Sequence, residues 1–161
     1  MTNSNNLIDS LEVYVLNNPD DVKPHWVSHF IVPTANELLI KIKNKNGNSG
    51  FGLATSYSDI SPIIKPFSNG LEDFIIGQDP FCPEKIYESI SKLTDTRISS
   101  EKGWSKEALI RISAALDIAC WDLMGKSSNI PLYKLFGGYR NKIPVYVTCG
   151  YYREGKTETE L

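Results

Sequence analysis

Apolar and polar positions alternate in three short stretches of the first third of the chain. These stretches are residues 11–16, 38–43 and 51–55. A period of two residues is typical of strands with one buried face. Asn46 and Gly47 separate the second and third stretches and predict a type I′ turn, in which both central residues have positive φ. The pattern therefore predicts a three-stranded antiparallel meander.

A helical period follows the strands. Pro62 after Ser61 predicts a helix that ends near Gly70, and residues 83–93 carry apolar positions at i, i+4 and i+7. Residues 94–102 are polar and predict a connection to the next helix. Strands followed by helices predict an α+β fold with the helices packed on one face of the sheet.

The longest predicted helix begins at Ser105, a good N-cap residue, and runs through residue 126. At about 100° per residue, four charged residues form one narrow polar stripe, and most of the remaining positions are apolar. The stripe consists of Glu107, Arg111, Asp122 and Lys126. A helix this apolar is expected to be buried on more than one side.

A short second helix and a hydrophobic strand are predicted after it. Pro131 suits the first turn of a helix, and Gly137 and Gly138 end it. Residues 143–149 are dense in β-formers and are flanked by breakers, which predicts a strand. No hairpin partner for this strand lies within reach.

Three linked segments carry a resemblance to a known family. Residues 114–123, 131–138 and 145–147 resemble, in order and spacing, the mandelate racemase/muconate-lactonizing branch of the enolase superfamily. The resemblance implies an N-terminal capping domain over residues 1–140, a three-stranded meander packed with a helical bundle. It also implies that residues 141–161 begin a truncated (β/α) barrel, whose first strand is the predicted one.

The resemblance also implies a reaction, namely magnesium-assisted α-proton abstraction from a carboxylic acid in an acid-sugar dehydratase or racemase. The family places its bases and its metal-binding carboxylates on later barrel strands, so neither Lys142 nor Lys156 matches a catalytic lysine. We therefore expect no catalytic or metal residue in this chain and no turnover by the chain alone. A small carboxylate substrate would require the barrel domain. The alternative is a non-catalytic interaction module whose exposed apolar face binds another chain.

By position, the family's two substrate-capping loops and the rim of its first barrel strand fall on eight residues. The expected substrate-contacting residues are Pro24, His25 and Trp26 in the first loop, Thr55, Ser56 and Tyr57 in the second, and Tyr151 and Tyr152 at the rim. A structural alternative stays open for each group. In that alternative Trp26 and the rim tyrosines pack, and His25 is solvated.

Other titratable residues give no metal site. Asp117 and Asp122 lie about 140° apart around a helix, so their carboxylates cannot easily share one ion. Asp117 lies off the polar stripe, where a buried carboxylate must be hydrogen-bonded, and structural anchoring is favoured over catalysis. His25 and His29 lack a third ligand at zinc spacing.

Composition and charge narrow the classes of partner. The chain has 161 residues, of which 41% are hydrophobic, enough for one domain with a sizeable core. Its net charge is −2 without a basic cluster, which disfavours nucleic acid and anionic membranes as partners. A small molecule, a second copy of the chain or a barrel fragment is the expected partner.

The termini and the cysteines suggest a cytoplasmic protein. The first six residues lack the basic and apolar regions of a signal peptide. Cys82, Cys120 and Cys149 are far apart and predict reduced core thiols. Residues 157–160 have the spacing of a capping box, which predicts either the start of a truncated strand–helix unit or a frayed tail.

Overall fold

An antiparallel sheet forms one layer of the domain. The computed structural model describes residues 4–17, 23–26, 29–32, 36–147, 151–157 and 159–160. Strands β1 (Ile8–Leu16), β4 (Asn36–Asn44) and β5 (Ser49–Ser56) pair in the order β1-β4-β5. Both pairings are antiparallel, with Val13 opposite Ile40 and Leu39 opposite Leu53. The predicted meander is confirmed.

The turn between β4 and β5 differs from the predicted type I′ turn. Gly47 has a φ of +87°, but among the described non-glycine residues only Asn129 has a positive φ. The backbone N–H of Asn44 donates to the Asn48 carbonyl at 3.0 Å, and the Asn48 N–H donates to Asn44 Oδ1 at 3.0 Å. The loop therefore has three residues and needs a left-handed conformation at one position only, which Gly47 supplies.

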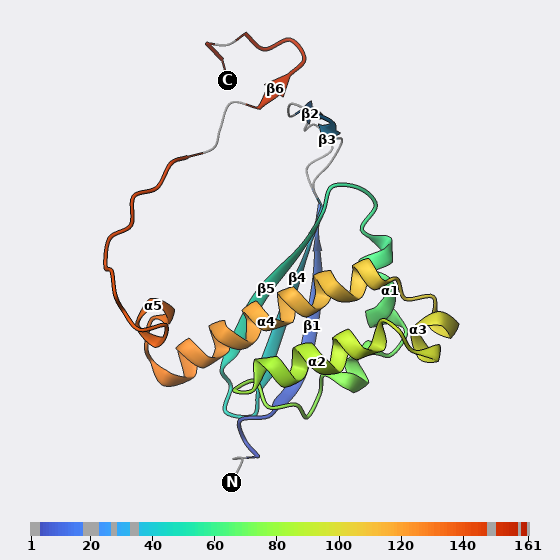
Figure 1. Cartoon of the computed structure of the whole chain (residues 1–161), viewed down its shortest axis with the longest axis vertical. Coiled ribbons are helices and arrows are strands. Elements are labelled where there is room, and N and C mark those ends of the chain that lie inside the picture. The colour runs from blue at the N-terminus through green and yellow to red at the C-terminus, as the bar shows by residue number, and fades with distance from the viewer. Residues whose placement is uncertain are drawn as a thin grey trace.

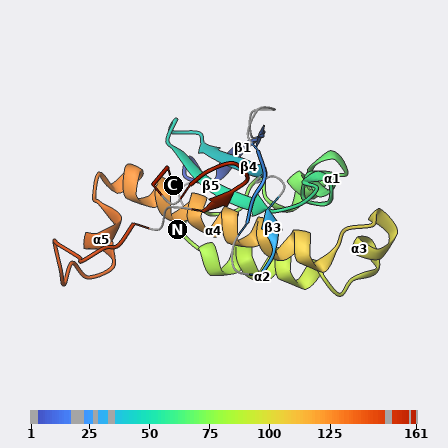
Figure 2. The same ribbon diagram turned by 90° about the horizontal axis from the view of Figure 1, so that it is seen from above.

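Helices cover one face of this sheet (Figure 1). They are α1 (Ser61–Ser68), the 3₁₀ helix η1 (Leu71–Phe74), α2 (Pro83–Leu93) and α4 (Lys106–Ser128). Figure 2 shows the sheet as one layer and helices α2 and α4 as the other. The α+β class and the three longer predicted helices are confirmed.

One helix lies where the sequence predicted a polar connection. Helix α3 (Arg97–Lys102) begins after Thr96, whose side chain accepts a hydrogen bond from the Ser99 N–H. Arg97 Nε donates to Glu101 at 2.6 Å across one turn. Only Ser99 of this helix is buried, so the segment has no apolar period to reveal it. The N-cap residue and the (i, i+4) ion pair are the features of the sequence that indicate this helix.

Helix α4 carries the core. Its residues Leu109, Ile112 and Leu116 are fully buried, as are Ile40 and Ile42 of β4. A fully buried side chain of this size contributes about 1.5–3 kcal/mol through the hydrophobic effect. The helix packs against β5, β4, α2 and α1, so the expectation of burial on more than one side is confirmed.

Two glycines of β5 allow α4 to approach the strand backbone. A Cβ atom at Gly52 would lie 1.9 Å from the Ala115 carbonyl oxygen, and one at Gly50 would lie 1.9 Å from the Ala119 carbonyl oxygen. Carbon and oxygen atoms cannot approach so closely without a shift of backbone. The close approach of helix and strand therefore requires glycine, which has no Cβ atom, at these two positions.

The segment after α4 departs from the sequence prediction. Helix α5 (Leu132–Leu135) is present, but residues 143–147 form no strand and are highly exposed, with Val145 at 85% and Tyr146 at 91%. The predicted strand at 143–149 is thus wrong over 143–147, and Thr148 and Cys149 lie outside the described residues. A parallel strand needs a neighbour for its hydrogen bonds, and no described strand lies beside this segment.

A second small sheet lies at one end of the domain. It consists of β2 (His25–Trp26), β3 (Ile31–Val32) and β6 (Tyr152–Arg153) in the order β3-β2-β6. The predicted capping box is formed in part, because Thr157 N–H donates to the Glu160 carboxylate at 2.9 Å. No helix follows in residues 159–160, and Glu158 and Leu161 lie outside the described residues.

Candidate functional site

The two predicted capping loops leave the large sheet at the same end. Leu16 ends β1 opposite Glu37, and Ser56 ends β5 opposite Asn36. The loop after β1 and the loop after β5 therefore start at neighbouring points. The Asn36 side chain donates to the Ser58 carbonyl at 3.1 Å, which ties the start of β4 to the second loop. Loops on a rigid sheet commonly carry binding residues.

The first loop and the predicted barrel rim meet in the small sheet. Trp26 pairs with Tyr152, and His25 pairs with Arg153. The His25 and Tyr151 rings lie with centroids 5.0 Å apart and an interplanar angle of 42°. The structure therefore brings together residues from two groups that the sequence predicted separately. Pro24 directly precedes this strand and is exposed.

The small sheet presents an apolar surface next to polar groups. A shallow hollow of about 450 Å³ is lined by Trp26, His29, Phe30 and Ile31. Phe30 is 54% exposed and Ile31 is 65% exposed. Large apolar side chains that gather on an exposed loop are typical of a surface that binds a ligand or a partner.

Arg153 is a residue of this cluster that the sequence interpretation did not select. It is exposed and lies opposite His25 in the β2–β6 pairing. An arginine paired with a histidine on neighbouring strands suits the recognition of a carboxylate, because the fork of N–H donors of a guanidinium matches two carboxylate oxygens. The sequence feature that could have identified Arg153 is its position directly after the two rim tyrosines.

The second loop is mainly structural. The Thr55 carbonyl accepts a hydrogen bond from Arg111 Nη1, and the buried Ser56 hydroxyl donates to the Asp59 carbonyl at 3.3 Å. Tyr57 is 56% exposed and is the residue of the three that presents its side chain outward. In the described part of the chain, no ring contact joins Tyr57 to His25 or Trp26. The structure thus brings the loops to one end of the sheet without direct contact between these rings.

The carboxylates of α4 serve structure and do not form a metal site. Asp122 Oδ2 accepts a hydrogen bond from the Phe51 N–H at 2.9 Å and pairs with Lys126. Anchoring was predicted for Asp117, but Asp122 is the residue that binds a backbone amide. Burial raises the pKa of Asp117, the nearby Glu84 raises it further, and a hydrogen bond with Trp121 opposes the rise.

The described residues contain no set of ligands for magnesium, the ion that the family resemblance implies. Groups of three or more His, Cys, Asp or Glu side chains in ligating arrangement are absent from that part of the chain. A magnesium ion requires oxygen ligands in near-octahedral geometry. The described residues therefore do not fit this ion.

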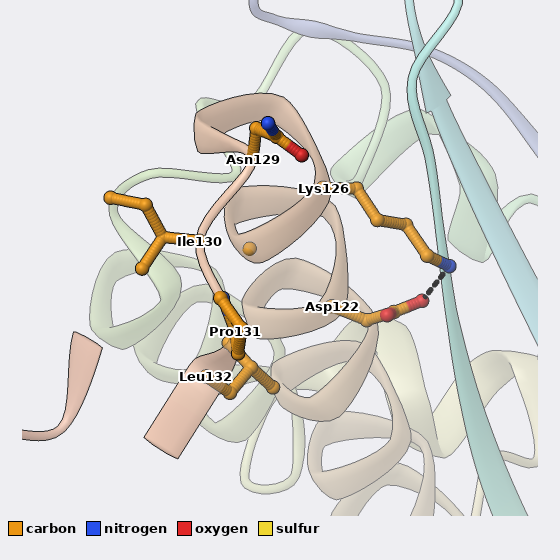
Figure 3. A pocket seen from close by; sticks show the side chains of 7 residues that line it. Asp122, Lys126, Asn129, Ile130, Pro131 and Leu132 are labelled. Carbon is orange, nitrogen blue, oxygen red and sulfur yellow. Dashed lines mark hydrogen bonds and ion pairs between the residues drawn. The ribbon is translucent and has the colours of Figure 1, made fainter. Parts of the chain in front are cut away.

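A second hollow, of about 300 Å³, lies at the C-terminal end of α4 (Figure 3). Asp122 and Lys126 point together toward β5, and Ile130, Pro131 and Leu132 line the side where the chain turns toward α5. The two opposite charges form an ion pair, so together they add no net charge to the hollow. This hollow marks the junction between α4 and α5.

No described helix combines the length and apolarity that crossing a bilayer would require. The described cysteines are both free: Cys82 is half-buried and Cys120 is buried. Cys149 lies outside the described residues.

Comparisons with known proteins agree on one family. The family model described as mandelate racemase/muconate lactonizing enzyme, N-terminal domain, matches residues 10–137. An arabinonate dehydratase of Saccharolobus solfataricus is 30% identical over 124 residues, which are 77% of this chain and 32% of that enzyme.

Solved structures give the same result. The crystal structure of a mandelate racemase/muconate lactonizing enzyme has a TM-score of 0.74 at 25% identity and covers 92% of this chain and 39% of its own. A racemase from Streptomyces coelicolor A3(2), solved with bound magnesium, has a TM-score of 0.66 at 26% identity over 83% of this chain and 36% of its own. The chain spans about a third of the length of the curated relatives it matches.

Proposed function

This chain belongs to the mandelate racemase/muconate lactonizing enzyme family, whose N-terminal domain it contains, and from that premise we propose that it forms the roof of a substrate site completed by a barrel domain. Residues 1–140 are the capping domain in this proposal, and residues 141–161 begin the barrel. The barrel carries the catalytic groups, and the chain contributes positioning and the exclusion of water.

One observation carries the proposal: the loops after β1 and β5 leave the same end of the sheet, and β2 and β6 pair there. A roof must gather its contact residues at one end of a rigid support, because substrate and barrel approach from that side. The exposed aromatic residues of this end include Trp26, Tyr57 and Tyr152.

The substrate class is a small carboxylate, such as an acid sugar. Arg153 and His25 provide N–H donors for a carboxylate, and the hydroxyl groups of Tyr151 and Tyr152 can donate to sugar oxygens. Trp26 and the apolar hollow beside it would exclude water from the bound acid. The parent reaction is α-proton abstraction with magnesium bound by barrel residues, in a dehydratase or a racemase.

The first test is turnover by the chain alone. The chain is incubated with magnesium, D₂O and a panel of sugar acids and α-hydroxy acids, and deuterium incorporation and dehydration are followed by NMR and mass spectrometry. We expect rates equal to those without protein. Turnover above that background would overturn the assignment as a roof without catalytic groups.

The second test supplies the missing part. Residues 1–140 are fused to the barrel of the S. solfataricus arabinonate dehydratase, and the kinetics of this hybrid are compared with those of its variants. Trp26→Ala and Tyr57→Ala are expected to raise KM at least several-fold. The matched control is Tyr87→Ala, because Tyr87 is similarly exposed at 46% but lies on α2. Equal KM values in all variants would contradict the role of these loops.

A second candidate function is a non-catalytic interaction module whose exposed apolar face binds another chain, such as a separate barrel fragment. Ile110 and Ile118 of α4 are 47% and 52% exposed, and residues 143–147 add further exposed apolar side chains. Such a surface fits a protein partner. Ile118→Lys should abolish the association of the chain with a separate barrel fragment if this face binds the barrel. Association unaffected by Ile118→Lys would argue against this candidate.

A further inference from the structure

The two edges of the large sheet are treated differently. At the β5 edge, α4 occupies two of the outward-facing backbone groups: Asp122 accepts from the Phe51 N–H, and Arg111 donates to the Thr55 carbonyl. At the β1 edge, the described backbone hydrogen bonds cover only the start of the strand, where Ile8 exchanges bonds of 2.9 and 2.8 Å with residues 77–78. β4 is the only described strand that pairs with β1.

The antiparallel register identifies the backbone groups that remain open. The backbone N–H of Phe51 donates to Asp122 and not to β4. Phe51 and Lys41 therefore form a non-hydrogen-bonded pair of the antiparallel β4–β5 ladder. The backbone N–H and C=O groups of Lys41 therefore face β1, where Glu12 is the paired residue. Because successive residues alternate in direction, three residues of β1 direct their N–H and C=O groups out of the sheet: Leu11, Val13 and Val15.

This open edge is apolar. Val13, Val15 and Leu16 are 36%, 42% and 44% exposed, and Glu12 is the only charged residue between positions 10 and 16. Natural edge strands are usually protected by lysine, proline, bulges or a covering element. Residues 10–16 contain neither lysine nor proline, no described strand other than β4 pairs with them, and the irregularity in the β1–β4 register lies before Ser10.

We propose that the β1 edge pairs with the β1 edge of a second copy of this chain, antiparallel about a two-fold axis at Val13, to form a continuous six-stranded sheet. In this register Val13 faces Val13 of the second copy, and Leu11 faces Val15. All three residues direct their backbone groups outward, so the pairing forms about six interchain hydrogen bonds.

The side chains fit the same register. Glu12 faces Tyr14 of the second copy, so no carboxylate lies opposite another carboxylate. Within one chain Tyr14 already donates to Glu12, and Lys41 Nζ lies 3.0 Å from the Glu12 carboxylate. Shifting the two-fold axis to Glu12 would place two carboxylates directly opposite each other, which is unfavourable. Charge therefore favours the axis at Val13 over the axis at Glu12.

The test measures mass in solution. Size exclusion with light scattering is expected to give twice the chain mass of 18.1 kDa for the wild type at high concentration, falling toward one chain mass on dilution. Val13→Lys places two ammonium groups opposite each other and should weaken association at least tenfold. Leu53→Lys is the matched control, because Leu53 is 43% exposed on β5, away from this edge, and should leave association unchanged.

A second variant keeps the test decisive if Val13→Lys does not fold. The two Cα atoms of a hydrogen-bonded antiparallel pair lie about 5.5 Å apart, within the span of a disulfide. Val13→Cys should therefore form a covalent dimer on mild oxidation, and Leu53→Cys should not. A wild-type monomer at all concentrations, a dimer insensitive to Val13→Lys, or equal cross-linking of both cysteine variants would each overturn the proposal.

Discussion

Asp122 Oδ2 accepts a hydrogen bond from the backbone N–H of Phe51 at 2.9 Å, across 71 residues of sequence. Eleven residues earlier on α4, Arg111 donates to the Thr55 carbonyl at the other end of the same strand. The polar stripe of α4 therefore lies along the edge of β5 and occupies backbone groups that an edge strand would otherwise expose. One helix both packs on the sheet and occupies two backbone groups of its edge.

Replacing Asp122 should destabilise the fold. Asp122→Leu removes the acceptor of the Phe51 N–H and the partner of Lys126, so we expect a loss of about 1–3 kcal/mol in the free energy of unfolding. Asp122→Asn keeps an acceptor oxygen and should lose less. Urea denaturation followed by circular dichroism measures both. Glu107→Leu is the control, because Glu107 pairs with Arg111 on an exposed turn and its substitution should change stability by less than about 0.5 kcal/mol. Equal losses for Asp122→Leu and Glu107→Leu would contradict the anchoring role.

Gly52→Ala should destabilise the fold more strongly. The added methyl would meet the Ala115 carbonyl oxygen at 1.9 Å, so the helix or the strand must shift. We expect a loss above about 4 kcal/mol, or no folded protein. Gly47→Ala separates this clash from simple backbone strain. Gly47 has open space around it and a φ of +87°, so its substitution should cost only about 1 kcal/mol. A small loss for Gly52→Ala would show that α4 can move away from β5.

The sequence predicted the parts of the fold that depend on local periodicity. The meander, the long helix and its polar stripe follow from alternation and from a 3.6-residue period, and the structure confirms them. What Asp122 binds could not be predicted, because its acceptor role depends on a strand 71 residues away. Gly50 and Gly52 fit an alternating strand pattern equally well whether or not a helix backbone approaches them.

The candidate site was predicted only in part. The sequence selected His25, Trp26, Tyr151 and Tyr152 by position in a family pattern, and the structure brings them together in one small sheet. That pairing joins segments more than 120 residues apart, so no local pattern could reveal it. The strand expected at 143–149 was a local inference, and it fails over 143–147 because β propensity does not supply a hydrogen-bonding neighbour.

The raised pKa of Asp117 predicts an unusual pH dependence of stability. Burial and Glu84 disfavour its charged form in the folded state, so the group stabilises the fold below its unfolded pKa near 3.8 and loses that contribution as pH rises through the folded value. Asp117→Asn removes the half-buried charge. We therefore expect the variant to be at least as stable as the wild type at pH 7, with the difference shrinking as pH falls toward 3.5.

Asp59 provides a control of opposite sign for Asp117. The backbone N–H of Ser61 and its hydroxyl donate to the Asp59 carboxylate and lower its pKa. Asp59 therefore stabilises the fold above its unfolded pKa and loses that contribution on acidification. Asp59→Asn should be less stable than the wild type at pH 7 and approach it at low pH. Thermal melts at several pH values measure both variants, and the same trend in both would refute the assignment.

Cys120 should resist thiol reagents in the native state for two separate reasons. Its side chain has no exposed surface, and burial raises its pKa to about 12, with Asp117 and Asp79 adding to the rise. At pH 8 only about one thiol in ten thousand would be ionised, and the thiolate is the reactive form. Cys82 is half-buried and should react first.

Iodoacetamide labelling at pH 8, mapped by peptide mass spectrometry, is expected to modify Cys82 in native protein and Cys120 only when urea unfolds the chain. Because Cys120 lies on α4 within the core, its labelling should follow the unfolding curve. Rapid labelling of Cys120 without urea would mean that α4 separates from the core under native conditions.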